Sequence, residues 1–232
     1  MNEDHGFLED ENPAQVLHAK TLRSPVARGR LLSIEVPRLP RGCTLIRAED
    51  IPGKNSLDSV SSSLSILAKD ALIYKGEPVA LLVGSDAAQL EGLASECQVI
   101  AEEQMPHFNY EKFSSDQLAA KRTALIGNPD AAFKKAASIL EGSYRTSRQE
   151  QWYAECQGAL AMYSKEGLSI KVASQWPFHV RQAVARVLDL KPEEIVVLAS
   201  EIGVHLDGKL WYPSSLPPRL PWRLLFVKNQ SN

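Results

Sequence analysis

The sequence lacks the cysteine pairs, the basic surplus and the long apolar segments that mark several classes of protein. Its three cysteines, Cys43, Cys97 and Cys156, form no Cys-x-x-Cys pair. This spacing supports neither a structural zinc site nor an iron–sulfur cluster, so we expect no metal-binding residues and three reduced thiols in a cytoplasmic protein. A net charge of −2 gives no sign of a nucleic-acid partner. No apolar run reaches the roughly 18 residues of a membrane span, and we expect no membrane association.

The first half of the chain alternates between strand-like and helix-like segments. Residues 32–36 alternate with period two, which predicts a strand with Leu32, Ile34 and Val36 on one face. Residues 79–83 form an apolar run of strand length that ends at Gly84. Ser85 or Asp86 can cap a following helix. Apolar residues recur there at helical spacing, and they are Leu90, Leu93, Ala94 and Cys97.

The second half begins with a polar connection and continues as mixed strands and helices. Asn128 and Pro129 indicate the start of a short helix. Pro177 stands where proline favours a helix start, and a valine stripe follows. The polar residues away from that stripe, including His179, are expected to form a solvated face of a helix over 178–190. The predicted strands cover residues 138–146, 158–164, 168–174 and 193–200, the last of them buried.

Two groups of motifs, in one order along the chain, resemble a single protein family. The first group is "LHAKTLRSP", "IEVP", "RAEDIPG" and "YKGEPVALLVGSDAAQLEGLASECQVIAEE". The second is "EGSYRTSRQEQWYAECQGALA", "ASQWPFHVRQAVARVLDL", "PEEIVVLASEIG" and "DGKLWYPS". Together they span about residues 14–216 and resemble the molybdopterin-binding subunit of the xanthine dehydrogenase and aldehyde oxidase family.

The resemblance implies an α+β fold, in which the family's hammerhead domain precedes part of a mixed α/β molybdopterin-binding domain. The leader is polar and acidic, and we expect it to be disordered or loosely docked. The expected division is an acidic leader (1–13), a hammerhead domain (14–104), a linker (105–127), the N-terminal part of the molybdopterin-binding domain (128–216) and an irregular tail (217–232).

Members of this family are molybdenum hydroxylases, which use a molybdopterin cofactor to hydroxylate purines, aldehydes or N-heterocycles. The resemblance implies iron–sulfur and FAD subunits as partners that carry the electrons away. The region that holds the family's catalytic glutamate has no counterpart here, so we assign no catalytic residue. We therefore expect an N-terminal fragment that is inactive alone and binds no cofactor alone. A complementing C-terminal molybdopterin-binding chain and a second copy in a homodimer are further candidate partners.

Family position suggests cofactor contacts in two segments, "SQWP" and "GVHLDGK". An amide suits a metal-bound oxo group because it donates a hydrogen bond without adding charge. The family's loop reads roughly Gly-Gly-Gly-Phe-Gly-Gly-Lys, and branched or bulky residues replace most of its glycines here. Because such residues resist positive φ, we expect Val204 and His205 to strain the loop or to move it away from a cofactor. The candidate cofactor-binding residues are Gln175, Gly203, Val204, His205 and Leu206.

The same sequence features also allow roles outside a cofactor site. The chain could be a non-catalytic module whose first domain docks another subunit. Gln175 could be an amide at a strand end that caps the next helix. Four polar residues near a strand start are better explained by structural hydrogen bonding, with an interface role second, and they are Gln149, Glu150, Gln151 and Glu155.

Overall fold

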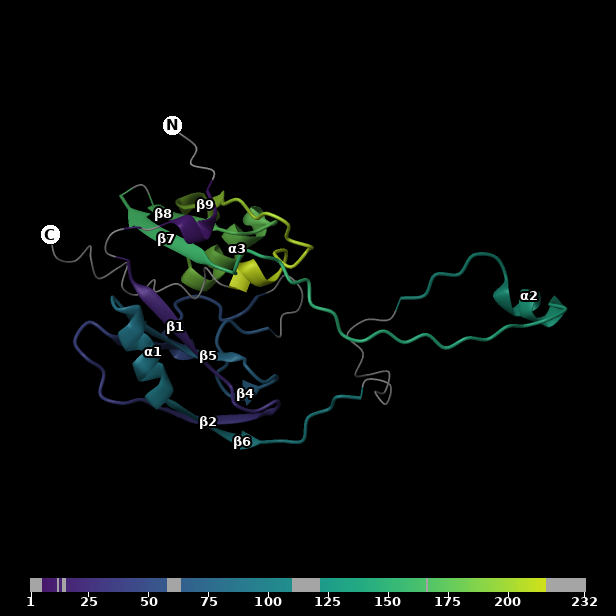
Figure 1. Ribbon diagram of the computed structural model, residues 1–232, viewed down its shortest axis with the longest axis horizontal. Helices are drawn as coiled ribbons and strands as arrows, with labels where there is room; N and C mark the ends of the chain where they lie inside the picture. The colour runs from purple at the N-terminus through teal and green to yellow at the C-terminus, as the bar shows by residue number, and fades with distance from the viewer. Residues whose placement is uncertain are drawn as a thin grey trace. The chain divides into compact units, whose positions relative to one another are not determined.

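The computed structural model describes residues 6–11, 13, 16–57, 64–109, 122–165 and 167–215 (Figure 1). The chain divides into two compact units, Met1–Met105 with Gln151–Asn232, and Pro106–Glu150. The fold is mixed α/β, as expected. Its strands are β1 (His18–Arg23), β2 (Gly29–Glu35), β3 (Thr44–Arg47), β4 (Ala71–Leu72), β5 (Pro78–Gly84), β6 (Gln98–Glu103), β7 (Ala159–Ser164), β8 (Gly167–Val172) and β9 (Ile195–Ala199). Its α-helices are α1 (Ala87–Glu96), α2 (Pro129–Lys135) and α3 (Pro177–Leu188), and short 3-10 turns are η1 (Leu8–Asp10), η2 (Ala48–Asp50), η5 (Pro192–Glu194) and η6 (Tyr212–Ser215).

The N-terminal part of the larger unit forms two antiparallel sheets, ordered β1-β5-β3 and β4-β2-β6. Helix α1 packs against β1 and β5 (Figure 1). Its start follows the sequence prediction, because the Asp86 side chain accepts a hydrogen bond of 3.0 Å from the Gln89 N–H. Leu90 and Leu93 are the buried residues of its apolar face.

Strand β5 is buried along its whole length because it contributes to two cores. Leu81 and Val83 pack in a core that also contains residues of α3 and β8. Ala80 and Leu82 lie in a second core with residues of α1 and β2. Burial of both faces explains why this segment is continuously apolar rather than alternating.

The third sheet has the order β7-β8-β9, with β7 and β8 antiparallel and β8 and β9 parallel. Helix α3 connects the two parallel strands and begins at Pro177, as predicted. Its stripe of Val180, Val184, Val187 and Leu188 is buried against β8, whose inward residues are Leu168, Ile170 and Val172.

Two strands form where the sequence predicted them, but with different faces buried. In β2, a bulge between Leu31 and Ser33 shifts the alternation, so Leu32 is exposed and does not share the buried face of Ile34. Strand β9 was expected to be buried, but it is the edge of its sheet, and Val196 and Leu198 are about half exposed.

The strand predicted for residues 138–146 is wrong. In the unit formed by residues 106–150, the described residues contain helix α2 and no strand. Ile139 and Leu140 are exposed in an irregular segment. An isolated extended segment leaves its backbone N–H and C=O groups unpaired, so apolar composition alone does not make a strand. Helix α2 does form as expected, with the Asn128 side chain capping its start.

The turn at Pro52 and Gly53 closes the C-terminal end of α3. The Gly53 N–H donates to the Val187 carbonyl at 2.9 Å, and the Lys54 N–H donates to the Arg186 carbonyl at 3.1 Å. These bonds satisfy carbonyls that have no partner within the helix. A Cβ at position 53 would lie 2.1 Å from the Arg186 oxygen, so only glycine permits this approach.

We therefore expect Gly53→Ala to destabilise the protein by about 1–3 kcal/mol, because the added methyl group forces the turn away from α3. The matched control is Gly92→Ala on the exposed side of α1, where a Cβ meets nothing within 4 Å. This control should stabilise the helix by up to about 1 kcal/mol. Urea unfolding measures both free energies, and equal effects of the two variants would contradict the capping role of Gly53.

Candidate functional site

The two segments singled out by family position meet at one edge of the third sheet. Gln175 follows β8 and the 203–209 loop follows β9, and the carboxyl ends of parallel strands lie side by side. The Gln175 N–H donates to the Lys209 carbonyl at 3.0 Å. The Gln175 Oε1 accepts from the Lys209 N–H at 3.2 Å. Gln175 is thus brought to the C-terminal end of the loop, and its described hydrogen bonds do not involve residues 203–206.

The donor end of the Gln175 amide is directed to a carboxylate. Its Nε2 donates to Asp207 Oδ1 at 3.1 Å. The family that this chain resembles has glycine at the position of Asp207. The contact therefore depends on aspartate replacing that glycine. The amide is consequently engaged with its own loop.

The backbone of the loop is left-handed at Gly203, Leu206 and Asp207, with φ of 52°, 46° and 61°. Of the two alternatives expected for Val204 and His205, backbone strain is wrong, because neither has a positive φ; displacement of the loop from a cofactor stays a prediction. The strain is displaced to Leu206, since leucine adopts this region rarely while aspartate tolerates it better. A bond of 2.8 Å from the Gly208 N–H to the His205 carbonyl closes the turn. The side chains of Val204 and Leu206 are largely exposed.

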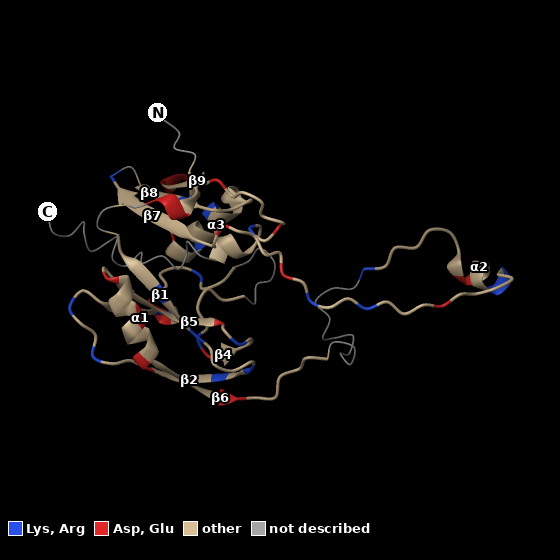
Figure 2. Ribbon diagram, viewed as in Figure 1, with Lys and Arg blue, Asp and Glu red and all other residues tan. Residues whose placement is uncertain are grey.

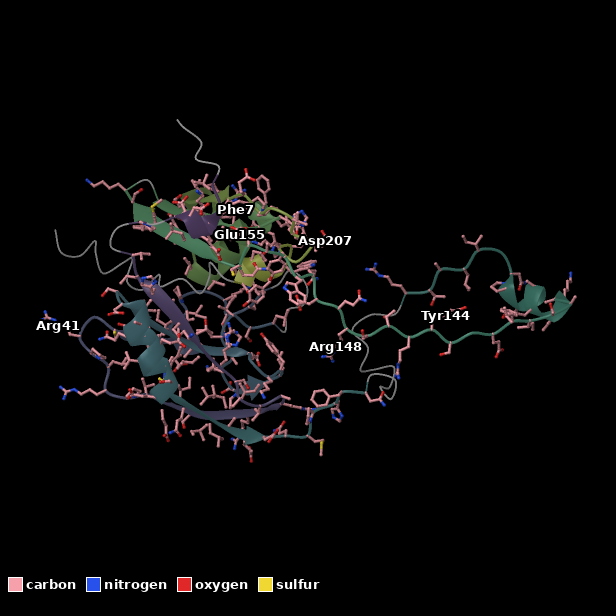
Figure 3. All side chains as sticks on the ribbon, viewed as in Figure 1. Phe7, Arg41, Tyr144, Arg148, Glu155 and Asp207 are labelled. Carbon is pink, nitrogen blue, oxygen red and sulfur yellow. The ribbon has the colours of Figure 1, made fainter. Side chains whose placement is uncertain are left out.

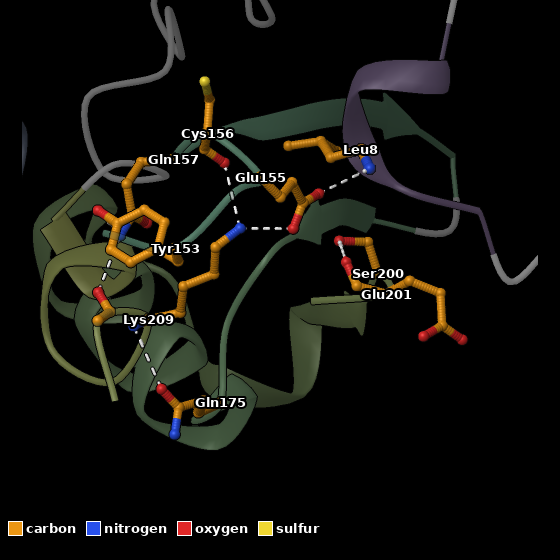
Figure 4. Close-up of polar contacts among 10 residues, drawn as sticks. Leu8, Tyr153, Glu155, Cys156, Gln157, Gln175, Ser200, Glu201 and Lys209 are labelled. Carbon is orange, nitrogen blue, oxygen red and sulfur yellow. Dashed lines mark hydrogen bonds and ion pairs between the residues drawn. The ribbon is translucent and has the colours of Figure 1, made fainter. Parts of the chain in front are cut away.

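The glycine and lysine at the end of the loop have structural partners. A Cβ on Gly208 would lie 2.2 Å from the Tyr153 ring, so the ring and the backbone can pack only with glycine there. Lys209 is fully buried, and its Nζ lies 2.5 Å from Glu155 Oε2 and 3.2 Å from the Cys156 carbonyl oxygen (Figure 4). Its ammonium group also lies 5.4 Å from the centre of the Tyr153 ring.

The Glu155 carboxylate joins three parts of the chain. One oxygen pairs with Lys209, and the other accepts from the Leu8 N–H at 3.1 Å (Figure 4). The sequence pattern assigned Glu155 to structural hydrogen bonding, which the structure confirms. Its pairing with Lys209 was missed because the two residues are separated by 54 positions and no local spacing connects them.

His179 is not part of a solvated face. Its Nδ1 lies 2.6 Å from the buried Ser214 Oγ, and its ring stacks on Trp176 with centroids 4.8 Å apart. The Trp211 ring lies edge-on at 6.0 Å. Burial lowers the pKa of His179, and the positive charge of Arg186 lowers it further. No local pattern indicated this cluster, because Ser214 and Trp211 lie in the 3-10 turn region far along the chain.

As it is folded here, the loop does not fit a molybdopterin cofactor. The amide that would face the metal donates to Asp207, and a carboxylate at that place repels an anionic, phosphate-bearing group. Among the described residues, no three His, Cys, Asp or Glu side chains gather to hold a metal ion. We derive no catalytic step through this loop.

Within the described part of the chain, no helix combines the length and apolar character needed to cross a membrane. Lys and Arg residues are interspersed with Asp and Glu along the ribbon (Figure 2).

Comparisons with known proteins show which proteins the chain is similar to. The family model of the molybdopterin cofactor-binding domain matches residues 110–204. Aldehyde oxidase 2 of Rattus norvegicus is 28% identical over 196 residues, which cover 81% of this chain and 14% of that protein. Xanthine dehydrogenase of Oryza sativa subsp. japonica is 28% identical over 207 residues, covering 85% of this chain and 15% of that protein.

Solved structures show the same fold. Quinoline 2-oxidoreductase from Pseudomonas putida 86 superposes with a TM-score of 0.70 at 25% identity, covering 85% of this chain and 28% of its own. Aldehyde oxidoreductase from Desulfovibrio gigas superposes with a TM-score of 0.67 at 19% identity, covering 82% and 24%. The chain is therefore similar to the molybdopterin-binding part of xanthine dehydrogenases and aldehyde oxidases, and it spans only a small part of the relatives' length.

Removing the buried cation should be strongly destabilising. We expect Lys209→Met to lower the free energy of unfolding by about 3–5 kcal/mol, because Glu155 is left as an unpaired buried charge. The matched control is Lys20→Met, which breaks the solvent-exposed pair with Glu91 and should cost at most about 1 kcal/mol. Urea unfolding compares the two, and similar small losses would show that the buried pair contributes little.

We expect His179 to titrate below its ordinary pKa of 6.5. Since the unfolded state then binds the proton more readily, stability is retained above pH 6.5 and declines as the pH falls below it. Arg186→Gln should raise the pKa of His179 by removing the neighbouring cation. NMR titration of the ring protons measures both values, and a wild-type pKa at or above 6.5 would contradict the effect of burial.

Proposed function

We propose that this chain supplies a hammerhead-type domain and the first part of the molybdopterin-binding domain of a cytoplasmic molybdenum hydroxylase. On its own it neither retains the cofactor nor hydroxylates a substrate. The bond between the Gln175 amide and Asp207 carries this proposal, because one of the two N–H donors of the amide bonds to the loop's own carboxylate and a negative charge lies beside the group that would face a metal-bound oxo group. The three free thiols support a reducing compartment.

In an assembled enzyme, Gln175 and residues 203–206 would be the positions that face the cofactor, and the contact with Asp207 would first have to open. The matched relatives are named for aldehydes, xanthine and quinoline, so we propose a reaction on an aldehyde, a purine or another N-heterocycle. A complementing molybdopterin-binding chain would supply the missing cofactor contacts. Iron–sulfur and FAD subunits would then accept the electrons.

A second candidate function, a docking module without catalysis, is favoured by exposed aromatic residues, which lie at α3 and near η6 and not in the first domain, where docking was expected. Trp176 and Trp211 pack edge-to-face with ring centroids 5.2 Å apart, and both remain about 40% exposed. Phe178 and Tyr212 are also exposed. Aromatic side chains that remain in solvent are typical of surfaces that bind another protein.

Molybdenum content tests the first proposal. The chain, co-expressed with the enzymes of cofactor synthesis, should contain far less than one molybdenum per protein by mass spectrometry. Quinoline 2-oxidoreductase expressed in the same cells is the positive control for cofactor supply. Near-stoichiometric metal in this chain would overturn the proposal.

Size-exclusion chromatography separates the two functions. A split enzyme should form a complex and acquire molybdenum only when the remaining part of a relative's cofactor domain is co-expressed. A docking module should assemble without that part, as a homodimer or with another subunit, and Trp211→Ser should weaken this assembly. A monomer under every condition would contradict the docking function.

A further inference from the structure

Residues 6–11, named here the N-terminal strap, lie against the third sheet. Figure 3 labels Phe7 of the strap and Glu155, and Figure 4 shows the Leu8 N–H bonded to the Glu155 carboxylate. Phe7 forms a parallel bridge with Glu201, and the Glu201 N–H donates to the Gly6 carbonyl at 3.4 Å. Of the two expectations for the acidic leader, docking is therefore correct for these residues.

Charge and shape both hold the strap on the sheet. Glu11 forms an ion pair with Lys171 of β8, and Lys171 is mostly buried by its surroundings. The Leu8 side chain fills the space beside Gly158, where an added Cβ would lie 2.6 Å from Leu8 Cδ2. The strap therefore crosses from the end of β9 to the start of β7 at the sheet edge that carries the candidate site.

The strap and the loop share the same supports. Glu155 accepts from Leu8 on one oxygen and from Lys209 on the other. Phe7 contacts the position of Gly203, since a Cβ there would lie 3.5 Å from its ring. Displacing the strap therefore removes one partner of Glu155 and the packing on the first residue of the loop.

The strap also acts on an exposed thiol. A hydrogen bond from the Cys156 thiol to Glu9, together with the negative charge of Glu9, raises the pKa of Cys156. A raised pKa leaves less thiolate, which is the reactive form. The Cys156 carbonyl accepts a hydrogen bond from Lys209. The Cys156 thiol therefore lies next to the Glu155–Lys209 pair and can report changes there.

We propose that the N-terminal strap is a releasable clamp that holds the 203–209 loop in its present conformation. None of residues 6–11 is buried, and the Glu11 side chain of the ion pair with Lys171 remains partly exposed. Such contacts open locally at low free-energy cost and weaken with salt. When the strap is released, Glu155 loses the Leu8 N–H and the loop gains mobility. Cys156 loses Glu9 as a neighbour at the same time, so its alkylation rate reports the release. This regulation does not require that the chain bind a cofactor.

Charge reversal on the full chain tests the clamp. In Glu11→Lys, the strap is repelled by Lys171, so the rate of iodoacetamide alkylation at Cys156 should rise several-fold. Hydrogen exchange of the 200–209 amides should rise in parallel. The double variant Glu11→Lys/Lys171→Glu restores the attraction with opposite signs and should return both quantities towards wild type. Peptide mass spectrometry measures them in one sample.

Internal and matched controls separate release from unfolding. Cys43 and Cys97 lie away from the strap, and their alkylation rates should stay unchanged. Glu102→Lys reverses the surface pair with Arg30 in the second sheet and should affect neither Cys156 nor the loop. Faster alkylation of all three thiols in Glu11→Lys would indicate unfolding. In that case the milder variant Glu11→Gln tests whether the strap is released without unfolding. Unchanged Cys156 and loop rates in that variant, or no rescue in the double variant, would overturn the clamp.

Discussion

The buried ion pair between Glu155 and Lys209 is the interaction on which the architecture of the candidate site depends. A lysine without solvent exposure is tolerated only because a carboxylate, a backbone carbonyl and an aromatic ring surround its ammonium group. The pair fixes the end of the loop that follows β9. Through the second oxygen of Glu155, it also fixes the N-terminal strap. The segments near residues 8, 155 and 209 are therefore held together by the Glu155 carboxylate.

Local patterns predicted the elements that are determined by local physical chemistry. The cap at Asp86, the start of α3 at Pro177 and the valine stripe of that helix could all be inferred from spacing. The predictions that failed concern features that depend on contacts between distant parts of the sequence. The bulge beside Leu32 depends on the pairing of β2 with β6, and the exposure of Val196 depends on β9 having a neighbour on one side only. Residues 138–146 have the composition of a strand but pair with no strand among the residues that the structure describes.

The proximity of the two candidate segments was predictable from the sequence, but their contacts were not. Family position directed attention to Gln175 and to the loop after β9, and the parallel pairing of β8 and β9 brings these segments together. The bond from Gln175 to Asp207 could not be inferred, because it depends on a left-handed turn at Leu206 and Asp207. Gly208 is required for packing against Tyr153, and Lys209 neutralises the buried Glu155. These structural roles explain both residues without a bound ligand.

The double burial of β5 has an evolutionary consequence. Its alternate residues belong to two cores, one shared with α1 and the other with α3, so one strand serves segments from both halves of the sequence. A recombination event that exchanged either half alone would bring Leu81 and Val83 against an unmatched surface. Inheritance of the two halves should therefore be linked, and substitutions in β5 should be accompanied by compensating substitutions in both cores.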